Sequence, residues 1–137
     1  MFAPDIAAVP YADPWNESLE ARLSLLGRGR QRVAYYYEAA NNSTFRYRAY
    51  NMAQVLNHDT RRDVCASYFF AADLHRIDDI AQGADVLVIC RSGYNHQIGQ
   101  LIAKFKLRGK RVLFDIDDFV FNTDYTHLIV NTLGLDK

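Results

Sequence analysis

Four continuous apolar runs stand out along the chain. They cover residues 32–37, 64–70, 85–90 and 111–115. None alternates strictly between apolar and polar positions, which is the pattern of strands covered on both faces of a sheet. Each run is therefore predicted to be a buried strand. The three tyrosines at positions 35–37 are expected to belong to the strand core rather than to a binding platform.

Between these runs, apolar residues recur at helical spacing in three segments. Gly109 closes the third segment, and a short fourth helix is expected over residues 126–133. Strands that alternate with helices predict βαβ units, and hence a Rossmann-like, three-layer α/β/α fold with a parallel sheet of about four strands. The three stripes are Phe45, Ala49, Met52, Ala53 and Leu56; Leu74, Ile77, Ile80 and Ala81; and Ile98, Leu101, Ile102 and Phe105.

The first 30 residues precede this repeating pattern. They are expected to form an arm and an extra N-terminal helix, with Asp13 as its N-cap and Pro14 at its first helical position. Because this helix comes before the first strand, we expect it to pack on an edge of the sheet. The chain is thus divided into residues 1–30, the arm and helix, and residues 31–137, the Rossmann-like domain.

Composition narrows the function classes. The 16 basic residues balance the 16 acidic ones, so there is no bulk attraction to nucleic acid or to an anionic membrane, and recognition of an anion must be local. Cys65 and Cys90 lack metal-ligand spacing and are expected to be free thiols in a reducing compartment. No apolar stretch reaches the roughly 20 residues of a membrane span, and no signal peptide is recognisable. We therefore expect a cytoplasmic protein with no nucleic-acid partner and no membrane span.

The turn after the first strand carries unusual chemistry. Ligands of open parallel sheets bind beyond the carboxyl ends of the strands, yet neither a G-x-G-x-x-G loop nor a P-loop is present here, which disfavours NAD-type and ATPase functions. The next helix instead opens with Ser43 and Thr44, followed by Arg46 and Arg48. Arginines in a first turn oppose the helix macrodipole, which makes sense if an anion docks there. The alternative is two solvated arginines on an exposed helix face.

Two further strand ends carry polar clusters. After the third strand, Arg91 is placed to point into the cleft and His96 lies in the first turn of a helix, the alternative being a structural turn with an incidental histidine. At the fourth strand, Asp115, Asp117 and Asp118 fall within four residues. Such carboxylates are costly without partners, and the three arginines of the cleft are the expected partners. A purely structural ion-pair role is the alternative.

These segments in combination resemble a known family. The chain is similar to the N-terminal domain of family 4-type (group 1) glycosyltransferases with GT-B architecture, in which S-x-x-R-Y-R and D-[IV]-D-D-h-h-[FW] patterns recur together. The resemblance covers residues 31–137. It rests on Ser43-Thr44-Phe45-Arg46-Tyr47-Arg48, on Ala84-Asp85-Val86-Leu87-Val88-Ile89-Cys90-Arg91, and on Gly109-Lys110-Arg111-Val112 leading into Phe114-Asp115-Ile116-Asp117-Asp118-Phe119-Val120-Phe121.

The resemblance implies the acceptor-side half of an enzyme. Such enzymes transfer a sugar, with retention, from a nucleotide-sugar donor to a glycan or polysaccharide acceptor, and need no obligatory metal or other cofactor. A C-terminal domain of the same polypeptide holds most donor contacts, including an E-x7-E motif that this chain lacks, so the chain is expected to be a fragment inactive alone. The chain also lacks the glycine-rich loop of many members. No catalytic residue is assigned; the expected substrate-binding residues are Ser43, Thr44, Arg46, Arg48, Arg91, His96, Asp115, Asp117 and Asp118.

Two alternatives stay open. One is a non-catalytic binding or assembly domain, whose uncovered inter-domain face would support a homodimer of the fragment. The other is a phosphatase of the haloacid dehalogenase type, in which Asp115 would be the nucleophile and Asp117 the acid/base, with magnesium. Against the phosphatase, Phe119 stands where that motif has Thr or Val, and only 19 residues follow Asp118.

Overall fold

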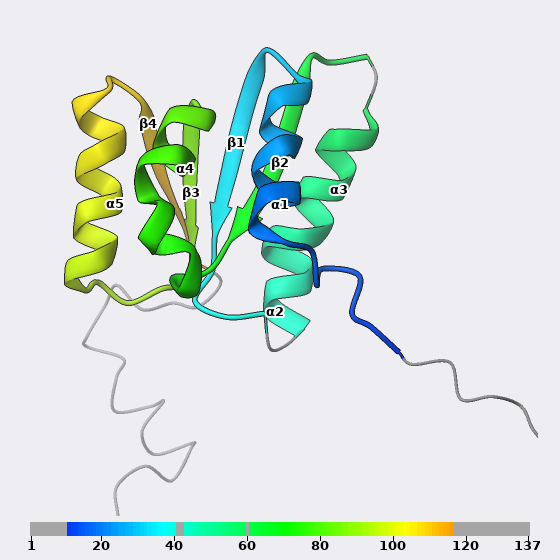
Figure 1. Cartoon of the computed structure of the whole chain (residues 1–137), viewed down its shortest axis with the longest axis horizontal. Coiled ribbons are helices and arrows are strands. Elements are labelled where there is room, and N and C mark those ends of the chain that lie inside the picture. Colours follow the sequence, from blue (N-terminus) through cyan, green and yellow to red (C-terminus); the bar gives the residue numbers. More distant parts are fainter. Residues whose placement is uncertain (1–10, 41–42, 60, 117–137) are drawn as a thin grey trace, which may run out of the picture.

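The computed structural model describes residues 11–40, 43–59 and 61–116, and it contains one sheet of four parallel strands. The order across the sheet is β2-β1-β3-β4 (Figure 1). The predicted α/β, Rossmann-like fold is therefore confirmed, and each predicted strand agrees with the structure to within one residue at either end. The strands are β1 (Gln31–Tyr36), β2 (Val64–Phe69), β3 (Val86–Cys90) and β4 (Arg111–Asp115).

Helices cover both faces of this sheet (Figure 1). Helices α1 (Leu19–Leu25), α4 (Ile77–Gly83) and α5 (His96–Leu107) pack on one face, and α3 (Asn51–His58) packs on the other. Right-handed crossovers explain this division, because the chain steps from β1 outward to β2 and then returns past β1 to β3. The short segments are η1 (Leu26–Arg28), α2 (Ser43–Phe45), the π-helical turn η2 (Arg46–Tyr50) and the 3-10 segment η3 (Ala71–Arg76).

The predicted start of the N-terminal helix is wrong. The carbonyl of Asp13 accepts a hydrogen bond from the amide of Asn16 at 2.9 Å, which makes residues 13–16 a turn with Pro14 at its second position. The helix begins at Leu19 instead, and the Ser18 hydroxyl caps it by accepting from the amide of Ala21. Proline at the second position of a turn and proline at the first position of a helix have the same φ, so the local sequence does not separate the two.

A buried ion pair fastens α1 to the domain. Arg22 and Asp73 are only 5% and 6% exposed, and their side chains meet in two hydrogen bonds of 2.6 and 2.9 Å. Arg22 also donates to the carbonyl of Tyr68, while Asp73 accepts from the amide of Phe70 at 2.7 Å. The helix packs on the edge strand β2 as predicted, but this pair makes it part of the core, which the sequence pattern did not reveal.

The third predicted helix has the termini that the sequence indicates. Asn95 caps α5 by accepting from the amide of Ile98 at 2.9 Å. Gly109 adopts φ +67°, and its amide donates to the carbonyl of Lys106 at the other end. The left-handed conformation is open to glycine without steric cost, which is why the helix ends there.

One strand departs from the expected burial. Leu113 and Phe114 of β4 are 52% and 54% exposed, so the expectation that every strand is covered on both faces is wrong for β4. Their partners on β3, Val88 and Ile89, are better covered. Leu113 and Phe114 point to opposite faces of the sheet, and what they share is a place near the end of an edge strand. On the face of Leu113, α3 packs mainly against β2, at the other side of the sheet.

Several predictions lie outside the described residues. They include the helix expected over 126–133, the arm over residues 1–10, and two of the three clustered aspartates, Asp117 and Asp118. Within the described ranges, no helix is both long and apolar enough to cross a membrane.

Candidate functional site

The carboxyl ends of the four strands meet at one edge of the sheet, which lies at the lower side of Figure 1 next to α2. The first predicted site segment, 43–48, follows β1 and forms α2 and part of η2. The second, at Arg91, directly follows β3, and Asp115 ends β4. The fold therefore carries all three segments to the edge where ligands of parallel sheets bind.

An ion pair links two of these segments. A terminal nitrogen of Arg48 lies 3.0 Å from a carboxylate oxygen of Asp115, 67 residues further along the chain. The two side chains are 40% and 32% exposed, so water and ligands reach both. An exposed pair of this kind contributes little to stability. It holds opposite charges side by side at the carboxyl edge of the sheet.

The π-helical turn η2 presents this arginine. The amide of Asn51 donates to the carbonyl of Arg46, five residues back, instead of four as in an α-helix. Phe45 and Ala49 remain fully buried on the sheet, as the predicted stripe requires, whereas Tyr47 is exposed. Single π-turns occur frequently at functional sites, and this one separates the buried stripe from the side chains at the edge.

Arg91 is held in an unusual backbone conformation. Its φ is +44°, and it is the one non-glycine residue among those described that has a positive φ. For an L-residue this region costs about 1–2 kcal/mol. The amide of Arg91 donates to the carbonyl of Asp115 at 2.9 Å, and its guanidinium reaches the Thr44 hydroxyl at 3.5 Å. The strained turn thus aims Arg91 from β3 toward the start of α2.

A shallow hollow of about 460 Å³ lies beside the Arg48–Asp115 pair. Its wall is mainly aromatic and aliphatic, with the ion pair as its charged part. Burial raises the pKa of Tyr35 and the carboxylate of Asp115 adds to this effect, so the phenol stays neutral at ordinary pH. The lining residues are Tyr35, Tyr47, Arg48, Met52, Val88, Leu113, Phe114 and Asp115.

The nearby thiol of Cys90 is inert. Burial, with a further contribution from the carboxylate of Asp115, raises the pKa of Cys90 to about 12, and Arg48 only partly opposes these effects. A thiol with this pKa is protonated at neutral pH and is a poor nucleophile. Cys90 therefore belongs to the core beneath the site, in agreement with its predicted role as a free thiol.

The structure does not gather every predicted residue. Arg46 is exposed on the helix surface, and the Nε2 atom of His96 lies 3.1 Å from the side-chain amide of Gln100 on its own helix. Asp117 and Asp118 lie outside the described residues, as does the side chain of Ser43. The structure therefore joins Arg48 with Asp115 and Arg91 with Thr44.

Sequence reasoning missed the apolar part of the site. The sequence places Tyr35 in the strand core and Met52 in an apolar helical stripe, but both line the hollow and Met52 is 44% exposed. Tyr47 lies between the two arginines of the S-x-x-R-Y-R pattern, and this position could have indicated that it belongs to the site. The contribution of β4 had no such signal, because it depends on where that strand is placed in the sheet.

The site offers binding chemistry of a definite kind. Among the described residues, no three His, Cys, Asp or Glu side chains come together as a metal site would require. What the edge provides is a guanidinium that donates to anions or hydroxyls, a carboxylate that accepts from hydroxyls, and aromatic surface. This combination suits a ligand that is rich in hydroxyl groups and has one apolar face.

Comparison with protein families, with curated proteins and with solved structures found no match to this chain.

Proposed function

We propose that the chain is the acceptor-side domain of a glycosyltransferase of GT-B architecture, which binds a glycan beside the Arg48–Asp115 pair. The observation that carries the proposal is this pair at the rim of an aromatic hollow, at the carboxyl edge of a parallel sheet. The resemblance of the segments 43–48 and 114–121 to that family supports it from the sequence.

The roles follow from the chemistry of each group. Asp115 accepts hydrogen bonds from sugar hydroxyls, and Arg48 donates to a hydroxyl or to a phosphate of the donor. Tyr35 and Tyr47 offer aromatic surface to the apolar face of a sugar ring, and the neutral phenol of Tyr35 adds a donor. In this proposal a second domain supplies the nucleotide-sugar contacts, and no metal takes part.

Titration calorimetry tests the proposal. The chain is titrated with a panel of oligosaccharides, and the protein that the whole reading frame encodes is titrated with nucleotide sugars. Arg48→Gln is expected to weaken the binding at least tenfold, since a hydrogen bond to a charged group contributes about 1.5–3 kcal/mol. Arg28→Gln, at the opposite end of the sheet, is the matched control. No heat with any sugar, or equal loss in both variants, would reject the proposal.

A second function has one observation in its favour. Leu113 and Phe114 are half exposed on an edge strand, and such an edge promotes association between chains. A non-catalytic assembly domain would use this surface to dimerise. Light scattering that shows a concentration-dependent dimer, abolished by Leu113→Lys, together with no sugar binding, would favour it over the enzyme.

A further inference from the structure

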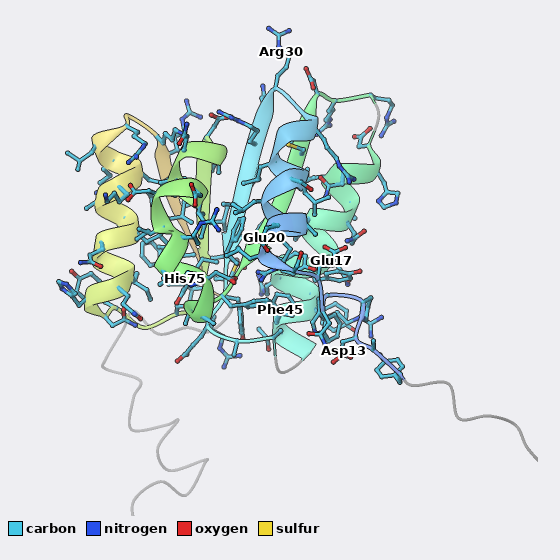
Figure 2. The ribbon with its side chains drawn as sticks, in the orientation of Figure 1. Asp13, Glu17, Glu20, Arg30, Phe45 and His75 are labelled. Atoms are coloured by element: carbon cyan, nitrogen blue, oxygen red, sulfur yellow. The ribbon has the colours of Figure 1, made fainter. Side chains whose placement is uncertain are left out.

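Basic residues gather at the amino ends of the strands, opposite the candidate site. They lie in or beside the turns that lead into β1, β2 and β4, and Figure 2 shows Arg30 at the extreme of this edge. Among the described residues, eight basic residues lie here, whereas the hollows of this edge are lined by three acidic residues, Asp59, Asp63 and Asp85, and a fourth, Asp78, reaches Arg108 at 3.3 Å. We call this surface the basic edge: Arg28, Arg30, Arg32, Arg61, Arg62, Arg108, Lys110 and Arg111.

The carboxylates nearby leave much of this charge unbalanced. Arg32 is well paired with Asp85 at 2.7 Å, whereas Arg30 lies 3.7 Å from Asp63 and its side chain is 89% exposed. Asp59 is shared between two arginines. The overall charge of zero therefore conceals a molecule in which positive charge is concentrated at one end, and an anionic partner meets that local field rather than the net charge.

The shape of the basic edge is broad and open. Three shallow hollows adjoin one another along it. The middle hollow, beside Arg30, shares Gln31 with the hollow beside Lys110, and it shares Arg62, Asp63 and Val64 with the hollow beside Arg61. Together these hollows reach from the turn before β2 to the turn before β4. Cations spread over several turn tips suit an extended anionic surface better than a single small anion.

Two features of the basic edge indicate which kind of extended anionic surface it binds. No aromatic residue lines these three hollows in the described part of the chain, so the stacking surfaces that bind single-stranded nucleic acid are missing. Leu107 is 83% exposed directly beside Arg108, which places an apolar side chain next to the cations. An exposed apolar side chain next to several cations is one of the features shared by surfaces that bind at the interface of a bilayer.

We propose that the basic edge docks the chain on a bilayer rich in anionic lipid. Arginine and lysine side chains contact lipid phosphates, and Leu107 enters the headgroup region. The carboxyl edge with Arg48 and Asp115 then faces away from the bilayer, free to bind a soluble ligand. This inference is independent of the glycosyltransferase proposal, since it rests on the opposite end of the sheet.

Co-sedimentation with vesicles tests the docking. The chain is mixed with vesicles of phosphatidylcholine alone, and with vesicles that also contain 30% phosphatidylglycerol as a test mixture, about enough for a strongly negative surface. We expect binding only to the anionic vesicles, and loss of that binding at high salt because surface charges are screened. Equal binding to both kinds of vesicle, or none to either, would overturn the proposal.

A pair of matched variants tests the location. Arg30→Gln with Arg111→Gln removes two charges from the basic edge, and each loss is expected to weaken partitioning about fivefold, so roughly 25-fold together. Gln100→Glu with Ala103→Glu changes the net charge equally but on exposed positions of α5, and is expected to have a much smaller effect. An equal effect of both pairs would contradict a localised docking surface. Tighter binding to duplex DNA than to anionic vesicles would overturn the choice of partner.

Discussion

Replacing one partner of the Arg22–Asp73 pair is expected to be severely destabilising. In Asp73→Asn the side chain keeps its size and an oxygen for the amide of Phe70, but the guanidinium of Arg22 loses the charge that it meets at 2.6 and 2.9 Å. Since both groups are almost fully buried, the loss leaves an uncompensated charge in the core. Removing one partner of a buried pair costs about 3–5 kcal/mol.

The magnitude matters because the total stability of a domain is only about 5–15 kcal/mol. Arg22→Met is expected to cost as much stability as Asp73→Asn, because it leaves the Asp73 carboxylate buried without its ion-pair partner. The double variant removes both charges and is expected to cost clearly less than the two single changes added together, with a coupling of about 2 kcal/mol or more.

Urea unfolding followed by circular dichroism measures each member of this cycle. Asp78→Asn serves as the control, since it breaks the exposed pairs with Lys104 and Arg108 and should leave the unfolding midpoint almost unchanged. Single variants that unfold at the wild-type urea concentration, or strictly additive costs, would refute the idea that this pair joins α1 to the core.

Three further predictions concern single positions. Gly29→Ala is expected to destabilise the fold by about 1–3 kcal/mol in urea, because its new Cβ would lie 2.9 Å from the backbone nitrogen of Cys65. The Cys90 thiol, buried and with a raised pKa, is expected to react with iodoacetamide at pH 8 far more slowly in the folded chain than in guanidinium. The hydrogen bond from Arg32 lowers the pKa of Asp85. The stability that this pair contributes is therefore fully present above the unfolded-state pKa of about 3.9, and it is lost as the pH falls through the lower pKa of the folded state. Asp85→Asn should accordingly reduce the loss of stability on the acid side of the pH profile, which is its acid limb.

Each of these predictions has a contrasting outcome. Gly99→Ala is the control for Gly29→Ala, because only the exposed Tyr94 side chain stands in its way and alanine favours a helix, so it should be neutral or stabilising. Equal destabilisation of both would contradict the steric argument. Equal alkylation rates in folded and unfolded chain would show that Cys90 is accessible. An unchanged acid limb would show that Asp85 is not the group that titrates.

The helices and strands and the fold class follow from local patterns in the sequence. The continuous runs at β1, β2 and β3 are strands because apolar side chains on consecutive positions need cover on both sides, and the stripes between the strands are helices because their spacing leaves one apolar face. The run at β4 is also a strand, although its last apolar residues stay half exposed. Gly109 ended α5 as predicted, since that position needs a positive φ. These are local rules, and they operate on a few neighbouring residues at a time.

Which distant residues meet depends on how the elements pack in three dimensions. Arg48 reaches Asp115 rather than solvent because β4 lies beside β3 and α3 begins at the same edge, and no local pattern specifies that order. The start of α1 at Leu19 and the buried partner of Arg22 likewise depend on packing against β2 and η3. The same holds for charge. The net charge is obtained by counting residues in the sequence, but the gathering of basic residues at one end of the sheet follows from where the turns lie in space.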